Sequence, residues 1–214
     1  MTAPELDAAA HLKTIRALME RATVYRALSA PAALAAGVLT LLVSGLLLRM
    51  EATGRLSSGA FVWLWLAVLA LATGFNFFLL YRSAGRRGDP FATAGMKMAL
   101  RAVAPPLLAG FILSVLGASQ TSNYRDIVSF WALFYGLSLL AMGSFAPRSL
   151  LALGAGFFVC GLLSFMPFIR ALNGRDYQAA LVNMALTFGA LHLIYAICVF
   201  RMQRHQPETG DDGA

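Results

Sequence analysis

The chain has 214 residues, of which 59% are hydrophobic and 13% are charged. Soluble domains are about 45–50% apolar and about 25% charged, so this composition excludes an ordinary water-soluble protein and predicts one that lies in a lipid bilayer. The formal net charge of +7 comes from basic residues that flank apolar stretches. Because a nucleic-acid-binding protein needs a soluble basic face, we expect no nucleic-acid partner.

Residues 1–29 predict an amphipathic helix on the cytoplasmic surface of the membrane. Thr2 and Glu5 fit a capping box, and apolar residues recur behind them at helical spacing. The apolar face of this helix would lie against lipid or would dock against a partner protein. The residues that we predict for this contact are Leu12, Ile15 and Met19.

Six apolar stretches follow, and each is long enough to cross about 30 Å of hydrocarbon as a helix. None of them contains Asp, Glu, Lys or Arg. They cover residues 31–48, 60–81, 103–119, 127–144, 150–169 and 179–200. We therefore predict an all-α fold, a polytopic membrane bundle of about six transmembrane helices over residues 30–200.

The start of the third span has two interpretations. Asp89 and Pro90 look like an N-cap and a first helical position, well before the apolar stretch begins. Either a second surface helix lies here, or the span is one long helix that contains Pro105 and Pro106. After the last span, residues 201–214 are polar and acidic, and they predict a disordered cytoplasmic tail.

The distribution of basic residues predicts the orientation of the chain. Most of the 17 Lys and Arg residues lie in the N-terminal segment, the second and fourth connections and the tail. Basic residues are retained on the cytoplasmic side, so we expect both termini to be cytoplasmic. Arg86 and Arg87, in the second connection, are expected to contact the anionic headgroups of membrane lipids rather than to form a phosphate site.

A weak internal repeat runs through the spans. Ala-Pro dipeptides lie near the starts of the odd-numbered spans, and A-L-x-x-G pentapeptides begin at Ala70, Ala132 and Ala185 in the even-numbered ones. The pattern is typical of three helical hairpins in one orientation. The distance from dipeptide to pentapeptide is shorter in the second unit than in the other two, so unrelated spans remain the alternative.

The segment F-Y-G-x-x-L-L-A-x-G-x-F-A-P-R-S begins at Phe134 and precedes a glycine-rich apolar span. In this segment the chain resembles a class of small uncharacterised bacterial integral membrane proteins. The resemblance implies a protein of the bacterial cytoplasmic (inner) membrane. It implies no activity, ligand or catalytic residue.

Three polar residues form a candidate cluster inside the spans. At 1.5 Å of rise per residue, His192, Asn76 and Ser138 fall within about 7.5 Å of one another in depth. A histidine in the membrane suggests a proton relay or a pH sensor, whereas the simpler interpretation is a neutral ring hydrogen-bonded across one helix interface. No span carries an acidic partner, so we favour the simpler interpretation.

Asp126 and Asp176 lie in two similar Asn-x-Arg-Asp segments before the fourth and sixth spans. They could bind a cation or a substrate at the outer mouth of the bundle. We instead expect each to be the N-cap of the helix that follows, because a carboxylate there accepts backbone N–H bonds and faces the positive end of the helix dipole.

The sequence shows no pattern of facing carboxylates, nucleophile with a base, metalloprotease motif or nucleotide-binding loop. We therefore expect no enzyme activity, no cofactor and no metal. The leading hypothesis is a non-catalytic membrane component that binds a partner protein, regulates it or senses the membrane, with a homo-oligomer also open. The alternative is a small transporter or channel whose pathway passes the polar cluster at mid-membrane.

Overall fold

The computed structural model describes residues 29–50, 57–87, 94–119, 123–143, 146–167 and 175–204, and within these ranges the regular structure is entirely helical. The elements are α2 (Ala30–Met50), α3 (Ser58–Arg87), α4 (Ala94–Ser119), α5 (Tyr124–Leu140), α6 (Arg148–Leu163), α8 (Asp176–Met184), the π-helix η2 (Ala185–Leu191) and α9 (His192–Arg204). The last three follow one another without a break and form one rod. The all-α prediction is confirmed for this part of the chain. The predicted surface helix and the tail beyond Arg204 lie outside the described residues.

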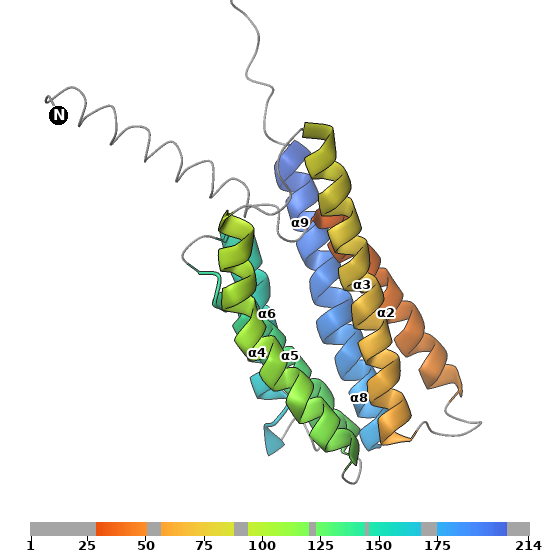
Figure 1. The fold of residues 1–214 in the computed structure, drawn as a ribbon. Coiled ribbons are helices and arrows are strands. Elements are labelled where there is room, and N and C mark those ends of the chain that lie inside the picture. Colours follow the sequence, from red (N-terminus) through yellow and green to blue (C-terminus); the bar gives the residue numbers. More distant parts are fainter. Residues whose placement is uncertain are drawn as a thin grey trace, which may run out of the picture.

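The helices form two groups (Figure 1). In one group α5 packs against both α4 and α6, and in the other α2 packs against the rod of α8, η2 and α9, with α3 beside it. The groups contact each other where α5 meets α8, where α6 meets the rod and where α3 meets α4. They diverge toward the end of the molecule at which α3 ends and α4 begins (Figure 1).

Four stretches are helical, long and apolar enough to cross a membrane, namely Ala30–Met50, Gly59–Arg86, Met96–Gly117 and Asp176–Arg204. The predicted multi-span character is therefore confirmed for four of the six spans. The other two spans correspond to α5, with 17 residues, and α6, with 16 residues. At 1.5 Å per residue these helices are about 24–26 Å long, somewhat less than the hydrocarbon thickness of about 30 Å.

The predicted ends of these two shorter spans were wrong. α5 ends at Leu140 rather than at residue 144, and the chain then turns through Gly143, whose N–H is bonded to Leu140 O at 2.9 Å. α6 ends at Leu163 rather than at residue 169. The reason lies in Pro167, because proline disfavours helical geometry in the residue before it.

α4 runs without interruption from Ala94 to Ser119 and contains Pro105 and Pro106. Of the two interpretations of the third span, the structure therefore agrees with a single long helix. Each proline lacks an N–H, so two consecutive backbone hydrogen bonds are missing inside this helix.

Glycines allow α5 and α6 to approach each other closely. A Cβ atom added to Gly136 would lie 2.5 Å from the backbone nitrogen of Phe158, and one added to Gly161 would lie 2.6 Å from that of Leu133. Any side chain at either position would force the two helices apart. Small residues at helix contacts are the usual way in which membrane helices gain packing area.

The proposed repeat does not mark equivalent places in the fold. Of the three pentapeptide glycines, Gly136 and Gly189 lie at close helix contacts, whereas a Cβ on Gly74 would meet nothing within 4 Å. Pro31 and Pro147 lie at helix starts, but Pro105 lies inside α4. The three-hairpin arrangement therefore gains no support from these positions.

Basic residues gather at the end of the molecule where the two groups diverge. α3 and α9 end there, and α4 and α6 begin there (Figure 1). In the described ranges the basic residues at this end are Arg82, Arg86, Arg87, Lys97, Arg101, Arg148, Arg201 and Arg204, and those at the opposite end are Arg49, Arg125 and Arg175.

At the opposite end, an aromatic cluster joins the two groups. Phe61 of α3 is fully buried and makes edge contacts with Tyr124 of α5 and Tyr177 of α8, at ring-centroid distances of 5.1 Å and 5.8 Å. It also stacks on Trp131, at 6.2 Å. Such aromatic pairs add to the stabilisation that burial of the rings provides.

Candidate functional site

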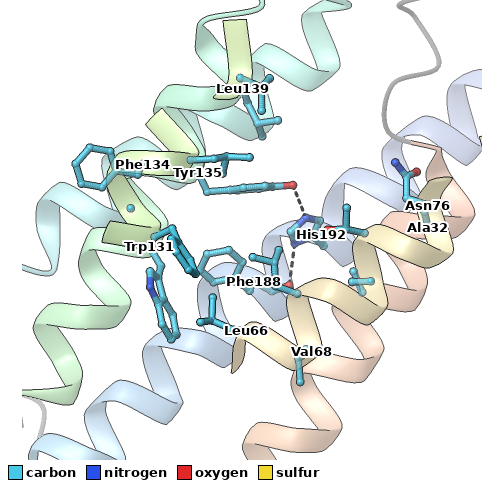
Figure 2. A pocket seen from close by; sticks show the side chains of 18 of the residues that line it. Ala32, Leu66, Val68, Asn76, Trp131, Phe134, Tyr135, Leu139, Phe188 and His192 are labelled. Carbon is cyan, nitrogen blue, oxygen red and sulfur yellow. Dashed lines mark hydrogen bonds between the residues drawn. The ribbon is translucent and has the colours of Figure 1, made fainter. Parts of the chain in front are cut away.

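A cavity of about 680 Å³ lies between the two helix groups. Side chains from α2, α3, α4, α5, α6 and the rod line it. This volume is within the range of about 300–1,000 Å³ that is common for small-molecule sites. Figure 2 shows part of the wall, with α5 facing the rod and α3.

The wall of the cavity is apolar and uncharged. Among the described residues that line it there is no Asp, Glu, Lys or Arg. The side chains with polar atoms are Thr40, Trp65, Thr73, Asn76, Ser114, Trp131, Tyr135 and His192. An ionic ligand would therefore find no countercharge in this wall.

The two sides of the cavity differ in exposure. Met184 and His192 of the rod, and Leu139 of α5, are 4–6% exposed. In contrast, large apolar side chains that line the cavity from α3 and α4 are more than a third exposed, and these are Leu69, Phe77, Leu100, Leu107, Leu108 and Phe111. The cavity is thus deep toward α5 and the rod and accessible on the side of α3 and α4.

His192 lies in the deep wall, by which we mean the buried side of the cavity that α5 and the rod form. Its two ring nitrogens have different partners (Figure 2). Nδ1 is 2.9 Å from the backbone oxygen of Phe188, and Nε2 is 3.1 Å from the hydroxyl oxygen of Tyr135. A carbonyl oxygen only accepts hydrogen bonds, so Nδ1 carries the proton of the neutral ring. Nε2 is then an acceptor, and the Tyr135 hydroxyl donates to it.

The π-helix places Phe188 and His192 in this geometry. The backbone N–H of His192 is bonded to Gly189 O, not to Phe188 O as in a regular α-helix. The oxygen of Phe188 accepts from the His192 ring instead. Short π-helical insertions of this kind occur frequently at functional sites.

Aromatic rings hold the Tyr135–His192 pair in place. The ring of Tyr135 lies 4.7 Å from that of Phe157 and 5.6 Å from that of Phe188, measured between centroids. The His192 ring makes an edge contact with Phe157 at 5.2 Å. Because α5, α6 and the rod supply these rings, the orientation of the pair is determined by packing as well as by hydrogen bonds.

A second polar contact joins α4 to α5 in the cavity wall. The indole N–H of Trp131 donates to Ser114 Oγ. The Ser114 hydroxyl in turn donates to Gly110 O at 2.6 Å. The hydrogens of both groups are therefore used within the protein.

The structure places only two of the three residues of the predicted polar cluster in the same cavity. His192 and Asn76 line the same cavity, whereas Ser138 is not among the lining residues. Ser138 is buried, and its hydroxyl donates to Phe134 O at 2.8 Å within α5. Asn76 Oδ1 lies 3.4 Å from Ser29 N, from which it accepts, so its position is linked to the start of α2.

Sequence reasoning missed Tyr135, the hydrogen-bond partner of His192. It lies in the F-Y-G segment quoted above, 57 residues before His192. Nothing in the local pattern relates the two positions, because the pair forms only when α5 packs beside the rod.

The predicted surface contacts lie mostly beyond the described residues. Leu12, Ile15 and Met19 fall outside them. Arg86 is exposed at the end of α3, and Arg87 is the last residue of that helix. This position agrees with a headgroup contact as well as with a simple solvated end.

The two aspartates of the Asn-x-Arg-Asp segments are not N-caps of the helices that follow them. Asn123 is the N-cap of α5, and its side chain exchanges hydrogen bonds with Asp126, in the manner of a capping box. Asp176 is the first residue of α8, and its Oδ2 accepts from Tyr124 N at 2.8 Å. Asp176 therefore caps α5, a helix more than fifty residues earlier, and its Oδ1 lies 4.0 Å from Arg125 Nε.

In the described ranges no group of three or more His, Cys, Asp or Glu residues could hold a metal ion. The cavity is an apolar pocket with a few polar side chains, and two of them, Tyr135 and His192, are bonded to each other in its buried side. Comparison of the chain with protein-family models, with curated proteins and with solved structures gave no match.

Proposed function

We propose that the protein is a non-catalytic integral membrane protein that holds a lipophilic small molecule between its two helix groups and so senses the composition of the membrane. The observation that carries this proposal is the uncharged cavity of about 680 Å³, deep toward α5 and the rod and accessible beside α3 and α4. In a bilayer the outer faces of α3 and α4 would contact lipid, so a molecule dissolved in the membrane would reach the cavity sideways.

Tryptophan fluorescence provides a direct test of this proposal. The chain has three tryptophans, of which Trp65 and Trp131 line the cavity and Trp63 is 62% exposed on another face of α3. In a Trp63→Phe background, a brominated fatty alcohol that enters the cavity should quench the remaining emission in a saturable way.

A pair of matched variants makes this test specific. Ala72 lines the cavity, whereas Ala70 lies on the exposed side of the same helix. Ala72→Phe should fill the cavity and abolish the saturable quenching, and Ala70→Phe should leave it unchanged. Equal quenching in both variants would mean that the probe only dissolves in the surrounding detergent or lipid, and the proposal would fail.

We further propose a bacterial cytoplasmic membrane location with six spans and both termini in the cytoplasm. The concentration of basic residues at the ends of α3 and α9 and the starts of α4 and α6 supports this orientation. The resemblance of the F-Y-G segment to bacterial membrane proteins supports the compartment. Four or six crossings both return the chain to its starting side, and the two topologies differ only in whether α5 and α6 cross the membrane.

Cysteine labelling distinguishes six spans from four. In a variant with Cys160→Ala and Cys198→Ala, a cysteine is placed at the exposed Ala141, in the turn after α5. With six spans this position is cytoplasmic and should react with an impermeant maleimide only after the cells are permeabilised. Ser57→Cys, before α3, serves as the outward-facing control and should react in intact spheroplasts. Labelling of position 141 in intact spheroplasts would contradict six spans.

The regulatory output is proposed to pass through the N-terminal segment. The support is its sequence alone, with the apolar face of Leu12, Ile15 and Met19. A pull-down from native membranes should recover a protein that is absent when Ile15→Asp and Met19→Asp are combined. If the same proteins are recovered with and without these changes, the segment is not a docking face.

Passage of a neutral solute is a second candidate function. The observation that favours it is that His192 and Asn76 line one cavity between helix groups that diverge toward one end. The scarcity of intramembrane charge argues against coupled ion transport. If this candidate holds, uptake of small neutral solutes into proteoliposomes should change in Asn76→Leu and His192→Leu variants relative to the unaltered chain.

A further inference from the structure

We infer that the cavity selects neutral lipophilic alcohols, whose hydroxyl group donates a hydrogen bond to Tyr135. This inference rests on the proposed function, because it names the chemical class of the molecule that the same cavity would hold. It follows from the donors and acceptors that the deep wall still offers, from the absence of charge and from the route of access.

The hydrogen-bond inventory of the deep wall leaves an acceptor and no donor. The Nδ1 proton of His192 is used by Phe188 O, and the lone pair of Nε2 is used by the Tyr135 hydroxyl. The oxygen of Tyr135 retains a lone pair, and no group in the described part of the chain donates to it. A ligand that satisfies this atom must supply a hydrogen.

The neighbouring polar contact offers no alternative donor. The N–H of Trp131 is used by Ser114, and the hydroxyl hydrogen of Ser114 is used by Gly110 O. At this deep wall, which α5 and the rod form, a ligand carbonyl or ether oxygen would find a hydrogen only if Tyr135 turned away from His192. That movement would leave Nε2 of His192 buried without a partner, which is unfavourable. Elsewhere in the lining, the indole N–H of Trp65 on α3 has no partner among the described residues, but its nitrogen is itself fully buried.

The lack of charge in the wall narrows the class further. A phosphate, carboxylate or ammonium group would enter the cavity without a countercharge, because no described lining residue is ionic. The remaining class has a long or bulky apolar body and a hydroxyl group. The volume of about 680 Å³ accommodates an isoprenoid or alkyl body.

The access route agrees with this class. The exposed side of the cavity consists of apolar side chains such as Leu108 and Phe111 of α4 and Phe77 of α3. A neutral alcohol dissolved in the bilayer would pass these residues with its apolar body and then place its hydroxyl group at the deep wall (Figure 2).

Three probes with the same body test the inference, namely farnesol, farnesyl methyl ether and farnesyl monophosphate. Binding is measured on the full-length Trp63→Phe protein in nanodiscs, by displacement of the brominated alcohol. Farnesol should bind about two- to tenfold more tightly than the ether, the range expected for one hydrogen bond. The monophosphate should bind more weakly than either.

Two variants test the assignment of the hydrogen bond to Tyr135. His192→Leu frees the hydroxyl hydrogen of Tyr135, so the ether should gain affinity and the difference between alcohol and ether should narrow. His192→Leu combined with Tyr135→Phe removes the donor and the acceptor, so alcohol and ether should bind alike. Tyr81→Phe, on an exposed part of α3, is the control and should keep the full preference.

The outcomes separate this inference from the proposed function. If all three probes bind, but the protein with Tyr135 and His192 intact binds farnesol no more tightly than the ether, the inference is wrong and the proposed function stands. If the double variant keeps the preference, Tyr135 is not the recognising group. If no probe displaces the brominated alcohol in a way that Ala72→Phe abolishes, both the inference and the proposed function fail. The comparison of farnesol with its ether uses the protein in which Tyr135 and His192 are unchanged. It therefore remains decisive if the variants at these two positions do not fold.

Discussion

Nε2 of His192 lies 3.1 Å from the hydroxyl oxygen of Tyr135, and this hydrogen bond joins the rod to α5 across the deep wall of the cavity. The other ring nitrogen is bonded to Phe188 O. The pair therefore connects the two helix groups in the lining of the cavity. We expect this hydrogen bond to stabilise the bundle.

Removal of the Tyr135 hydroxyl should lower the free energy of unfolding. Tyr135→Phe leaves Nε2 of His192 without its donor in a buried wall. Hydrogen bonds between membrane helices average about 0.6 kcal/mol and reach about 1.7 kcal/mol, so a loss in this range is expected. Unfolding in mixed micelles with increasing dodecyl sulfate measures it. Tyr81→Phe, the same change at an exposed site, should have no effect, and equal effects of the two changes would contradict the role of the pair.

Glycine substitutions should have opposite effects at two places in the fold. A Cβ on Gly136 would lie 2.5 Å from Phe158 N, so Gly136→Ala must separate α5 from α6 and should cost about 1–3 kcal/mol. A Cβ on Gly74 would meet nothing within 4 Å, so Gly74→Ala should be neutral or stabilising by up to about 1 kcal/mol. The same micelle titration measures both. Destabilisation by Gly74→Ala would show that α3 has a close neighbour at that point.

Loss of the Asp176 charge should weaken the start of α5. Asp176 accepts from Tyr124 N at 2.8 Å, so Asp176→Asn removes a charged cap, at an expected cost of about 0.5–2 kcal/mol. If this aspartate only caps a helix, the melting temperature of the unaltered protein should not change when Mg²⁺ or Ca²⁺ is added. A rise with either cation that Asp176→Asn abolishes would favour a cation site at the outer mouth.

The sequence predicted the parts of the fold that depend on local composition. Long apolar stretches without charge predicted α2, α3, α4 and the rod, because the hydrocarbon core imposes a minimum helix length. The ends of α5 and α6 were less predictable, since the turns at Gly143 and before Pro167 interrupt stretches that remain apolar.

The candidate site was predictable only in part, because its contacts join residues that are far apart in the sequence. His192 was noticeable as a lone polar ring in an apolar span, but its partner Tyr135 and the capping of α5 by Asp176 are contacts across more than fifty residues. Helical periodicity describes which residues share a face of one helix and does not specify which face of another helix they meet. The π-helix before His192 also has no signal in the sequence pattern, although it decides where the ring points.

The proposed function requires that the uncharged cavity holds a neutral lipophilic molecule, and the most direct measurement is the mass spectrometric identification of what stays bound to the purified protein. The unaltered chain, Ala70→Phe and Ala72→Phe should be purified from the same membranes in mild detergent. We predict a neutral lipophilic molecule at about one per chain in the unaltered protein and in Ala70→Phe, and its absence in Ala72→Phe, in which the cavity is filled. No retained molecule in any of the three proteins, or the same molecule in equal amount in all three, would contradict the proposed function.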